Sequence, residues 1–161
     1  MALVLTDMNL TQILPLECVK VPVENKDKES VIKELVDLLE ANPDLSGFDK
    51  KTALDAVMTR EQTRSTGIGS GIAIPHGKCK AVKKLVMSLG IAHEPIDFQS
   101  IDGKPVKIII LLVSPTDQTG PHIQALAKIS KLMLDEEFKE RLENSKSAEE
   151  AYELISSKEG E

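Results

Sequence analysis

The sequence predicts an α/β fold in which helices cover both faces of a mixed β-sheet. The expected order of elements is a strand, two helices, several strands and three helices. The longest apolar run, Val106–Val113, has the length of a buried strand. Hydrophobic residues are 41% and charged residues 29% of the 161 residues, which is typical of one compact domain over residues 1–161.

The N-terminal part is predicted to form a short helical turn, a strand and two helices. Residues 10–24 fit the helical turn and the strand. The first helix is expected over Asp27–Ala41, with Asp27 as its N-cap, because apolar residues recur there at helical spacing until Asn42-Pro43 ends it. The second helix is expected from Asp49 to about Arg60.

The middle of the chain is predicted to be rich in strands. Thr66–Gly71 carries three glycines at alternate positions, and the short apolar run after it stops at Pro75. This pattern indicates a loop that feeds a strand. Further strands are expected over Lys84–Ala92 and Pro105–Val113, with a turn at Phe98–Gly103 between them.

The C-terminal part is predicted to form three helices. A polar loop, Ser114–Gly120, follows the buried strand, and Pro121 suits the first position of a helix that runs to about Leu134. Asp135 can cap a short helix that ends near Leu142. Ser147, with Glu150 three residues later, predicts a capping box for the last helix.

Composition and charge argue against several classes of function. The formal net charge of -6 argues against nucleic-acid binding and against docking on anionic lipid. No apolar stretch approaches the roughly 20 residues that span a bilayer, so we expect no membrane insertion. The N-terminus has no basic segment or long apolar core of a targeting signal. Cys18 and Cys79 are too few for a disulfide scaffold, so we expect reduced thiols in a cytoplasmic protein.

Two histidines occupy positions where a functional role is possible. His76 lies after Pro75, at the expected end of a strand, and before Gly77, which allows a turn. Such a place exposes an imidazole at the edge of a sheet, either for function or as a plain surface histidine. His122 would be the second residue of its helix, where unpaired N–H groups keep a histidine neutral and suit an anion. His122 is equally consistent with a polar residue at a helix start that has no functional role.

Arginine and glycine residues nearby could hold an anion. Arg60 ends its helix, where a cation is stabilising, but its guanidinium can also bind a phosphoryl group in bidentate fashion. Arg64 competes for that role. The loop that contains Thr66, Gly69, Ser70 and Gly71 could present backbone N–H groups to an anion. It lacks the Lys-Ser/Thr of a P-loop and the final glycine of a dinucleotide-binding motif.

Two other chemistries compete for the histidines. His76, His93 and His122 do not have metal-ligand spacing, and no carboxylate-histidine motif accompanies them, so we expect no metal and no other cofactor. Cys79 lies three residues after His76 and could form a Cys-His nucleophilic pair, but nothing in its surroundings marks an activated thiol.

Three segments resemble one family. Residues 60–76, REQTRSTGIGSGIAIPH, resemble the active-site segment of phosphotransferase-system enzyme IIA domains of the fructose/mannitol and nitrogen-regulatory class. Residues 111–126, LLVSPTDQTGPHIQAL, are similar to the family's second signature, and residues 148–155, AEEAYELI, to its C-terminal end. The resemblance implies a three-layer α/β/α sandwich around a mixed sheet of four to five strands.

The resemblance also implies roles for single residues. His76 matches the phosphorylated histidine, Arg60 the active-site arginine and His122 the second active-site histidine. Neutral His76 would accept the phosphoryl group, while Arg60, His122 and N–H groups near Gly69–Gly71 stabilise its oxygens. Cys79 has no counterpart role in the family, and Gly120-Pro121 departs from the family pattern just before His122.

The implied function is a phosphocarrier of the phosphoenolpyruvate-dependent phosphotransferase system. The donor would be a histidine-containing phosphocarrier protein, and we favour a regulatory, nitrogen-type branch with a regulatory target protein as partner. The alternative is a stand-alone sugar-specific enzyme IIA that passes the group to enzyme IIB. A third alternative is a binding domain that is never phosphorylated. The sugar, the target and the oligomeric state stay open.

Overall fold

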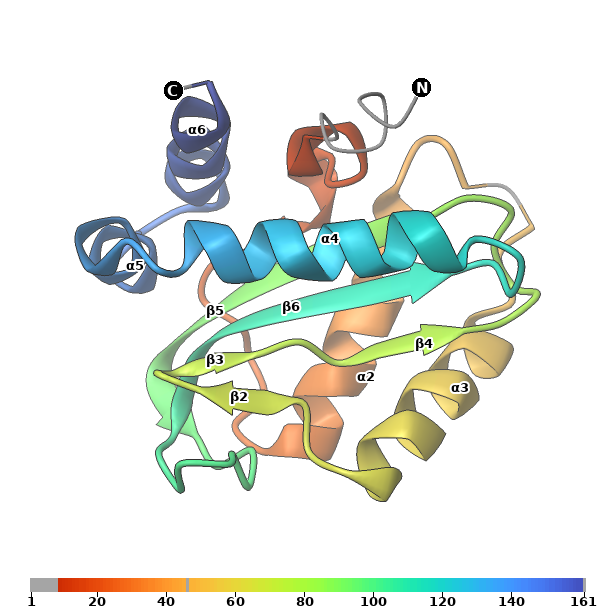
Figure 1. The fold of residues 1–161 in the computed structure, drawn as a ribbon, viewed down its shortest axis with the longest axis horizontal. Helices are drawn as coiled ribbons and strands as arrows, with labels where there is room; N and C mark the ends of the chain where they lie inside the picture. Colours follow the sequence, from red (N-terminus) through yellow and green to blue (C-terminus); the bar gives the residue numbers. More distant parts are fainter. Residues whose placement is uncertain (1–8, 46, 161) are drawn as a thin grey trace.

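A computed structural model describes residues 9–45 and 47–160 of the chain (Figure 1). The helices are α2 (Lys28–Leu38), α3 (Lys50–Thr63), α4 (Thr119–Leu132), α5 (Glu136–Glu143) and α6 (Ala148–Glu159), with the 3-10 turns η1 (Leu10–Gln12), η2 (Leu16–Cys18) and η3 (Leu39–Ala41). The strands are β1 (Val19–Lys20), β2 (Gly67–Gly69), β3 (Ile72–Ala73), β4 (His76–Lys78), β5 (Val86–Ile96) and β6 (Val106–Ser114). The N-terminal residues in which we expect no targeting signal lie outside the described part, except Asn9 and Leu10.

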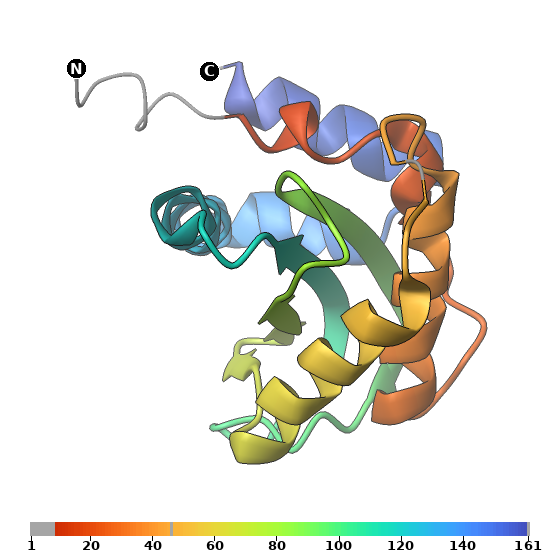
Figure 2. The same cartoon turned by 90° about the vertical axis from the view of Figure 1, so that its right-hand side faces the viewer.

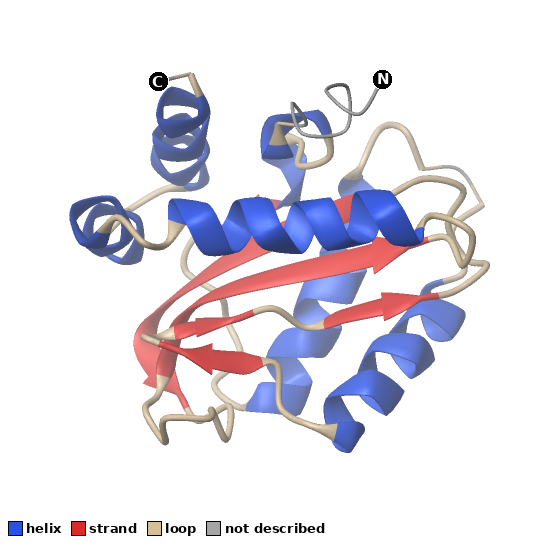
Figure 3. Cartoon of the chain, in the orientation of Figure 1, coloured by secondary structure: helices blue, strands red, loops and turns tan. Residues whose placement is uncertain are grey.

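The strands form one mixed sheet. Its order is β1-β5-β6-β3-β2, and β4 pairs with β6 beyond the end of β3. The two long strands β5 and β6 are antiparallel, as are β2 and β3, whereas β1 runs parallel to β5, and both β3 and β4 run parallel to β6. Figure 3 shows this sheet in red between the helices.

The described residues contribute six strands, one or two more than the sequence predicts. The expected loop over Thr66–Gly71 contributes β2, and the strand expected to stop at Pro75 is divided. Its first part, β3, ends at Ala73, and β4 begins at His76. Pro75 cannot donate a ladder hydrogen bond, although its carbonyl still accepts one from Leu112 N–H at 3.0 Å.

Helices cover both faces of the sheet, which confirms the three-layer α/β/α arrangement. Figure 2 shows α4 and α6 on one side and α2 and α3 on the other. Each side has its own buried cluster of mainly aliphatic side chains. Alternate residues of β6 enter the two clusters, so Ile108, Ile110 and Leu112 face α4, α5 and α6, while Ile109, Leu111 and Val113 face α2 and α3.

Short polar residues start four helices as the sequence predicts. The side chains of Asp27, Asp49, Asp135 and Ser147 each accept a hydrogen bond from the backbone N–H three residues on. The expected capping box is incomplete, because the Glu150 carboxylate accepts from Lys146 N–H instead of Ser147 N–H.

Two helix boundaries differ from the prediction in ways that affect the site. The α3 helix continues past Arg60 to Thr63. The α4 helix begins at Thr119, so Pro121 is its third residue, a first-turn position whose N–H would have no intrahelical partner. Within residues 9–45 and 47–160, no helix combines the length and apolar character needed to cross a membrane.

Candidate functional site

His76 lies at the start of β4, beside the C-terminal half of β6. It is opposite Leu112 in the parallel ladder, and its side chain is partly buried. Its Nδ1 atom lies 2.8 Å from the carbonyl oxygen of Ile74. Because a carbonyl oxygen can only accept a hydrogen bond, Nδ1 carries the ring hydrogen. In the neutral ring, Nε2 therefore keeps its lone pair.

The electrostatic surroundings keep the His76 ring neutral. Burial lowers the pKa of this imidazole, and the positive charges of Arg60 and Lys78 lower it further. The hydrogen bond to Ile74 and the charge of Glu61 act in the opposite direction. The net effect favours the unprotonated Nε2 that a phosphoryl acceptor needs.

His122 packs against His76 from α4. The two ring centroids are 5.2 Å apart and the rings meet edge to face at 63°. His122 is the fourth residue of its helix rather than the second, and its backbone N–H already donates to Gln118 at 3.2 Å. Its backbone is therefore not available to an anion, and only the side chain can contribute to the site.

Burial explains why the His122 ring stays neutral. The side chain is only 4% exposed. Burial, the charge that His76 would carry if protonated and the charge of Lys78 together lower the pKa of His122 from 6.5 to about 4. The sequence prediction of a neutral His122 rested on the helix N-terminus, whereas the structure supplies burial as the main cause.

Two polar contacts hold the start of α4 against the sheet. Ser114 Oγ at the end of β6 lies 2.6 Å from His122 Nδ1. Lys78, two residues after His76 and hence on the same face of β4, donates from Nζ to Thr119 Oγ1 at 3.1 Å. Neither Ser114 nor Lys78 was among the predicted site residues. For Lys78, the i, i+2 spacing from His76 was a usable signal.

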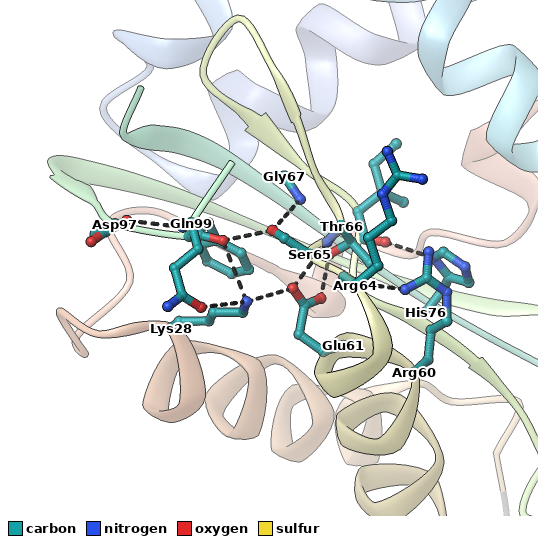
Figure 4. A network of polar contacts seen from close by, with 12 residues as sticks. Lys28, Arg60, Glu61, Arg64, Ser65, Thr66, Gly67, His76, Asp97 and Gln99 are labelled. Atoms are coloured by element: carbon teal, nitrogen blue, oxygen red, sulfur yellow. Dashed lines mark hydrogen bonds and ion pairs between the residues drawn. The ribbon is translucent and has the colours of Figure 1, made fainter. Parts of the chain in front are cut away.

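Arg60 is the arginine that the fold places beside His76. Its Nη1 donates to the carbonyl of Arg64, the C-cap residue of α3, at 2.7 Å. Figure 4 shows the Arg60 guanidinium next to the His76 ring, while the Arg64 side chain extends away from it. Arg64 therefore contributes to this region through its backbone carbonyl, which accepts the hydrogen bond from Arg60.

A buried carboxylate, Glu61, was not among the predicted site residues but binds the segment that leads to His76 (Figure 4). Glu61 is 4% exposed and pairs with Lys28 of α2 at 2.7 Å. Its carboxylate accepts from the backbone N–H and the hydroxyl of Thr66. The Thr66 carbonyl accepts from Ile74 N–H at 3.1 Å, and the Ile74 carbonyl contacts His76. The signal was available, because a glutamate in the last turn of a helix opposes the helix dipole.

The glycine-rich loop does not reach His76, contrary to the sequence prediction. Gly71 O accepts from Ile108 N–H, whereas His76 lies opposite Leu112, four residues along β6. That separation is about 13 Å at the rise of a strand. Ser70 N–H is already bound to the Asp102 carboxylate at 3.0 Å. Gly69, Ser70 and Gly71 all have positive φ and form the turn between β2 and β3.

Thr66 is the member of that predicted loop that lies on the His76 side. Its N–H and hydroxyl both donate to the Glu61 carboxylate, so neither is available to a phosphoryl group. Thr66 contributes instead through its carbonyl, which accepts from Ile74 N–H. Gly77 also has a role other than the predicted turn. It lies within β4, where a Cβ atom would come within 3.0 Å of the α3 backbone at Ala56 and Val57.

The competing chemistries receive no support from the geometry. His93 lies apart from the histidine pair, with Nε2 2.9 Å from the carbonyl of Ser145. Burial raises the pKa of the Cys79 thiol, so this cysteine is not an activated nucleophile. Cys18 and Cys79 are both free thiols, as predicted, and belong to clusters on opposite faces of the sheet.

Comparison with known proteins identifies the family. Residues 12–158 match the family described as "Phosphoenolpyruvate-dependent sugar phosphotransferase system, EIIA 2". The chain belongs to this enzyme IIA family. Its members are phosphotransferase components that pass phosphoryl groups by way of histidine. The family resemblance seen in the sequence and the fold expected from it are thereby confirmed.

Relatives of this enzyme IIA chain fall into two groups. It is 35% identical to the nitrogen regulatory protein of Escherichia coli, over 96% of this chain and 94% of that protein. It is 32% identical to the fructose-specific EIIABC component of Bacillus subtilis, over 92% of this chain but only 23% of that protein. The nitrogen regulatory protein IIA-Ntr of Neisseria meningitidis superimposes with a TM-score of 0.78 at 34% identity, covering 89% and 97% of the two chains.

Proposed function

We propose that His76 Nε2 is the atom that accepts the phosphoryl group. The observation that carries this proposal is the 2.8 Å contact of His76 Nδ1 with the Ile74 carbonyl. That contact commits the ring hydrogen to Nδ1 and leaves the lone pair of Nε2 available for attack. The lowered pKa of His76 keeps this form populated at neutral pH.

The transfer needs positioning and charge stabilisation rather than acid-base chemistry. The phosphorus–nitrogen bond of the donor breaks as a new one forms at His76 Nε2, and the donor imidazole leaves with the electron pair. No proton has to leave Nε2. The accepting ring gains positive character, which the Ile74 carbonyl stabilises through Nδ1–H. Arg60 supplies a fixed positive charge for the phosphoryl oxygens, and the His122 side chain supplies a hydrogen-bond donor.

The proposed donor is a histidine-containing phosphocarrier protein. We favour a regulatory branch with a regulatory target protein, because two relatives of similar length carry the name nitrogen regulatory protein. Sugar transport with enzyme IIB as the acceptor is the alternative, and the fructose-specific relative favours it. We further propose one domain over residues 1–161 that acts in the cytoplasm, which the single sheet and the two free thiols support.

Phosphorylation in a reconstituted system tests the assignment. The chain is incubated with phosphoenolpyruvate, enzyme I and the phosphocarrier protein, and its mass is measured before and after brief acid treatment. We expect one acid-labile phosphoryl group on the natural protein and on His93→Ala, and none on His76→Ala. Full labelling of a folded His76→Ala variant would overturn the assignment. An unlabelled natural protein would instead point to a domain that is never phosphorylated.

Transfer onward separates the two branches. The phosphorylated chain is mixed with a purified fructose-type enzyme IIB, and loss of the phosphoryl group is followed over time. Rapid transfer to enzyme IIB is the result expected of a sugar-specific enzyme IIA. Retention of the group on His76, with altered binding of a regulatory target, is the result expected of the regulatory branch.

A further inference from the structure

We infer that Ser114 is a positioning residue that fixes the tautomer of His122, so that His122 presents a hydrogen-bond donor at Nε2. This inference rests on the proposed phosphoryl transfer at His76 and extends it to a residue with no direct contact to the reacting atoms. Ser114 is the last residue of β6, and its side chain is fully buried.

Hydrogen-bond satisfaction determines which group donates. Within the described residues, the Ser114 hydroxyl makes one hydrogen bond, to His122 Nδ1 at 2.6 Å. If His122 Nδ1–H were the donor, the Ser114 hydroxyl hydrogen would be buried without an acceptor, which is unfavourable. If Ser114 donates, its hydrogen is satisfied and only oxygen lone pairs are left over. The second arrangement is therefore favoured, and His122 Nδ1 is the acceptor.

The remaining ring nitrogen of His122 is then a donor. A neutral imidazole carries one hydrogen, so acceptance at Nδ1 places that hydrogen on Nε2. Within residues 9–45 and 47–160, Ser100 Oγ is the one fully buried side-chain nitrogen or oxygen atom without a hydrogen-bond partner. His122 Nε2 also has no protein partner there, so it is not fully buried. It is therefore open to an incoming group.

The two histidines thus have opposite protonation patterns. His76 is held by a carbonyl acceptor, so its Nε2 has a lone pair for nucleophilic attack. His122 is held by a hydroxyl donor, so its Nε2 has a hydrogen for the phosphoryl oxygens. The opposite tautomer of His122 would present a lone pair to those oxygens and repel them. Ser114 accordingly decides whether His122 assists or opposes the transfer.

Substitution of Ser114 tests this role with two readouts. In Ser114→Ala the donor to Nδ1 is lost, and Ser114→Thr restores the hydroxyl on a side chain that strands favour. Ser88→Ala is the matched control, because Ser88 is an equally buried serine on the neighbouring strand whose hydroxyl donates to the Leu35 carbonyl instead. The ¹⁵N chemical shifts of the His122 ring report its tautomer in the unphosphorylated protein. The single-turnover rate from the phosphorylated phosphocarrier protein reports the transfer.

We expect the Nε2–H tautomer of His122 in the natural protein, in Ser114→Thr and in Ser88→Ala. Ser114→Ala should show a mixture of tautomers and a transfer rate lower by roughly tenfold, part of the ~10²–10³-fold cost of removing such a donor completely. A natural protein with the hydrogen on Nδ1 would overturn the inference, and so would a Ser114→Ala variant with unchanged shifts and rate.

The two readouts separate this inference from the proposed function. The tautomer is measured without any phosphoryl donor, so it is decided even if His76 is never labelled. Conversely, normal labelling of His76 with the hydrogen of His122 on Nδ1 would keep the proposed function and remove the role of Ser114. Equal thermal stability of Ser114→Ala and Ser88→Ala excludes a general effect of losing a buried hydroxyl.

Discussion

At the scale of single residues, the site depends on which ring atoms carry hydrogen. The Ile74 carbonyl fixes one histidine, and the Ser114 hydroxyl fixes the other. Sequence patterns place His76 and His122 in the right segments, but they hold no information on these contacts. The 5.2 Å approach of the two rings results from the pairing of β4 with β6 and from the start of α4 after β6.

Arg60 supplies the fixed charge, so its replacement should slow transfer without preventing it. We expect Arg60→Ala to lower the single-turnover rate by ~10²–10³-fold, the usual cost of removing one preorganised donor. Arg60→Lys should recover only part of this loss, because lysine lacks the planar fork of a guanidinium. Rapid-quench measurement of phosphoryl transfer gives both values. Arg64→Ala is the control, and an equal loss of rate in that variant would contradict the role given to Arg60.

Burial of His122 predicts a dependence of stability on pH. Its pKa is about 4 in the folded chain and 6.5 as an isolated group, so on acidification the unfolded state binds the proton first. The free energy of unfolding should therefore fall between pH 6.5 and 4, by roughly 2–3 kcal/mol from this residue. Urea unfolding at a series of pH values measures it. His122→Gln, which cannot titrate there, should show a smaller decrease, and an identical pH profile would refute the prediction.

At the scale of elements, the contact between β4 and α3 brings Arg60 and His76 together. Gly77 is the residue that allows this contact, because α3 backbone atoms occupy the space of a Cβ. Local sequence patterns predicted α3, but they predicted neither β4, because the strand was expected to stop at Pro75, nor the close approach of β4 to α3. For the same reason, the glycine-rich loop was expected to lie beside His76: its glycines indicate a tight turn, and only strand pairing shows where that turn lies.

Substitution at Gly77 should therefore affect both stability and transfer. Gly77→Ala forces α3 away from β4, and we expect a loss of about 1–3 kcal/mol in the free energy of unfolding together with slower transfer. Chemical denaturation gives the first value and the reconstituted assay the second. Gly120→Ala is the comparison, because a Cβ there meets no atom within 4 Å. A Gly77→Ala variant as stable as the natural protein would show that the contact between β4 and α3 is looser than described.

At the scale of the whole molecule, the sequence predicted the layers and the element order, and the family resemblance implied the roles of His76, Arg60 and His122. The layers and the element order follow from local signals: helical periodicity, N-caps such as Asp49, and the buried run that forms β6. Glu61 and Ser114 were missed because their roles depend on partners distant in sequence or on a neighbouring helix. Glu61 needs Lys28 of α2, and Ser114 needs His122 of α4.

The central claim is that the phosphoryl group is carried on Nε2 of His76. It is tested most directly by NMR of the phosphorylated chain labelled with ¹⁵N-histidine, in which phosphorus–nitrogen coupling identifies the bonded atom. We predict coupling to Nε2 of His76, with Nδ1 of the same ring still protonated and hydrogen-bonded to Ile74. Coupling to Nδ1 of His76, or to either nitrogen of His122, would contradict the account.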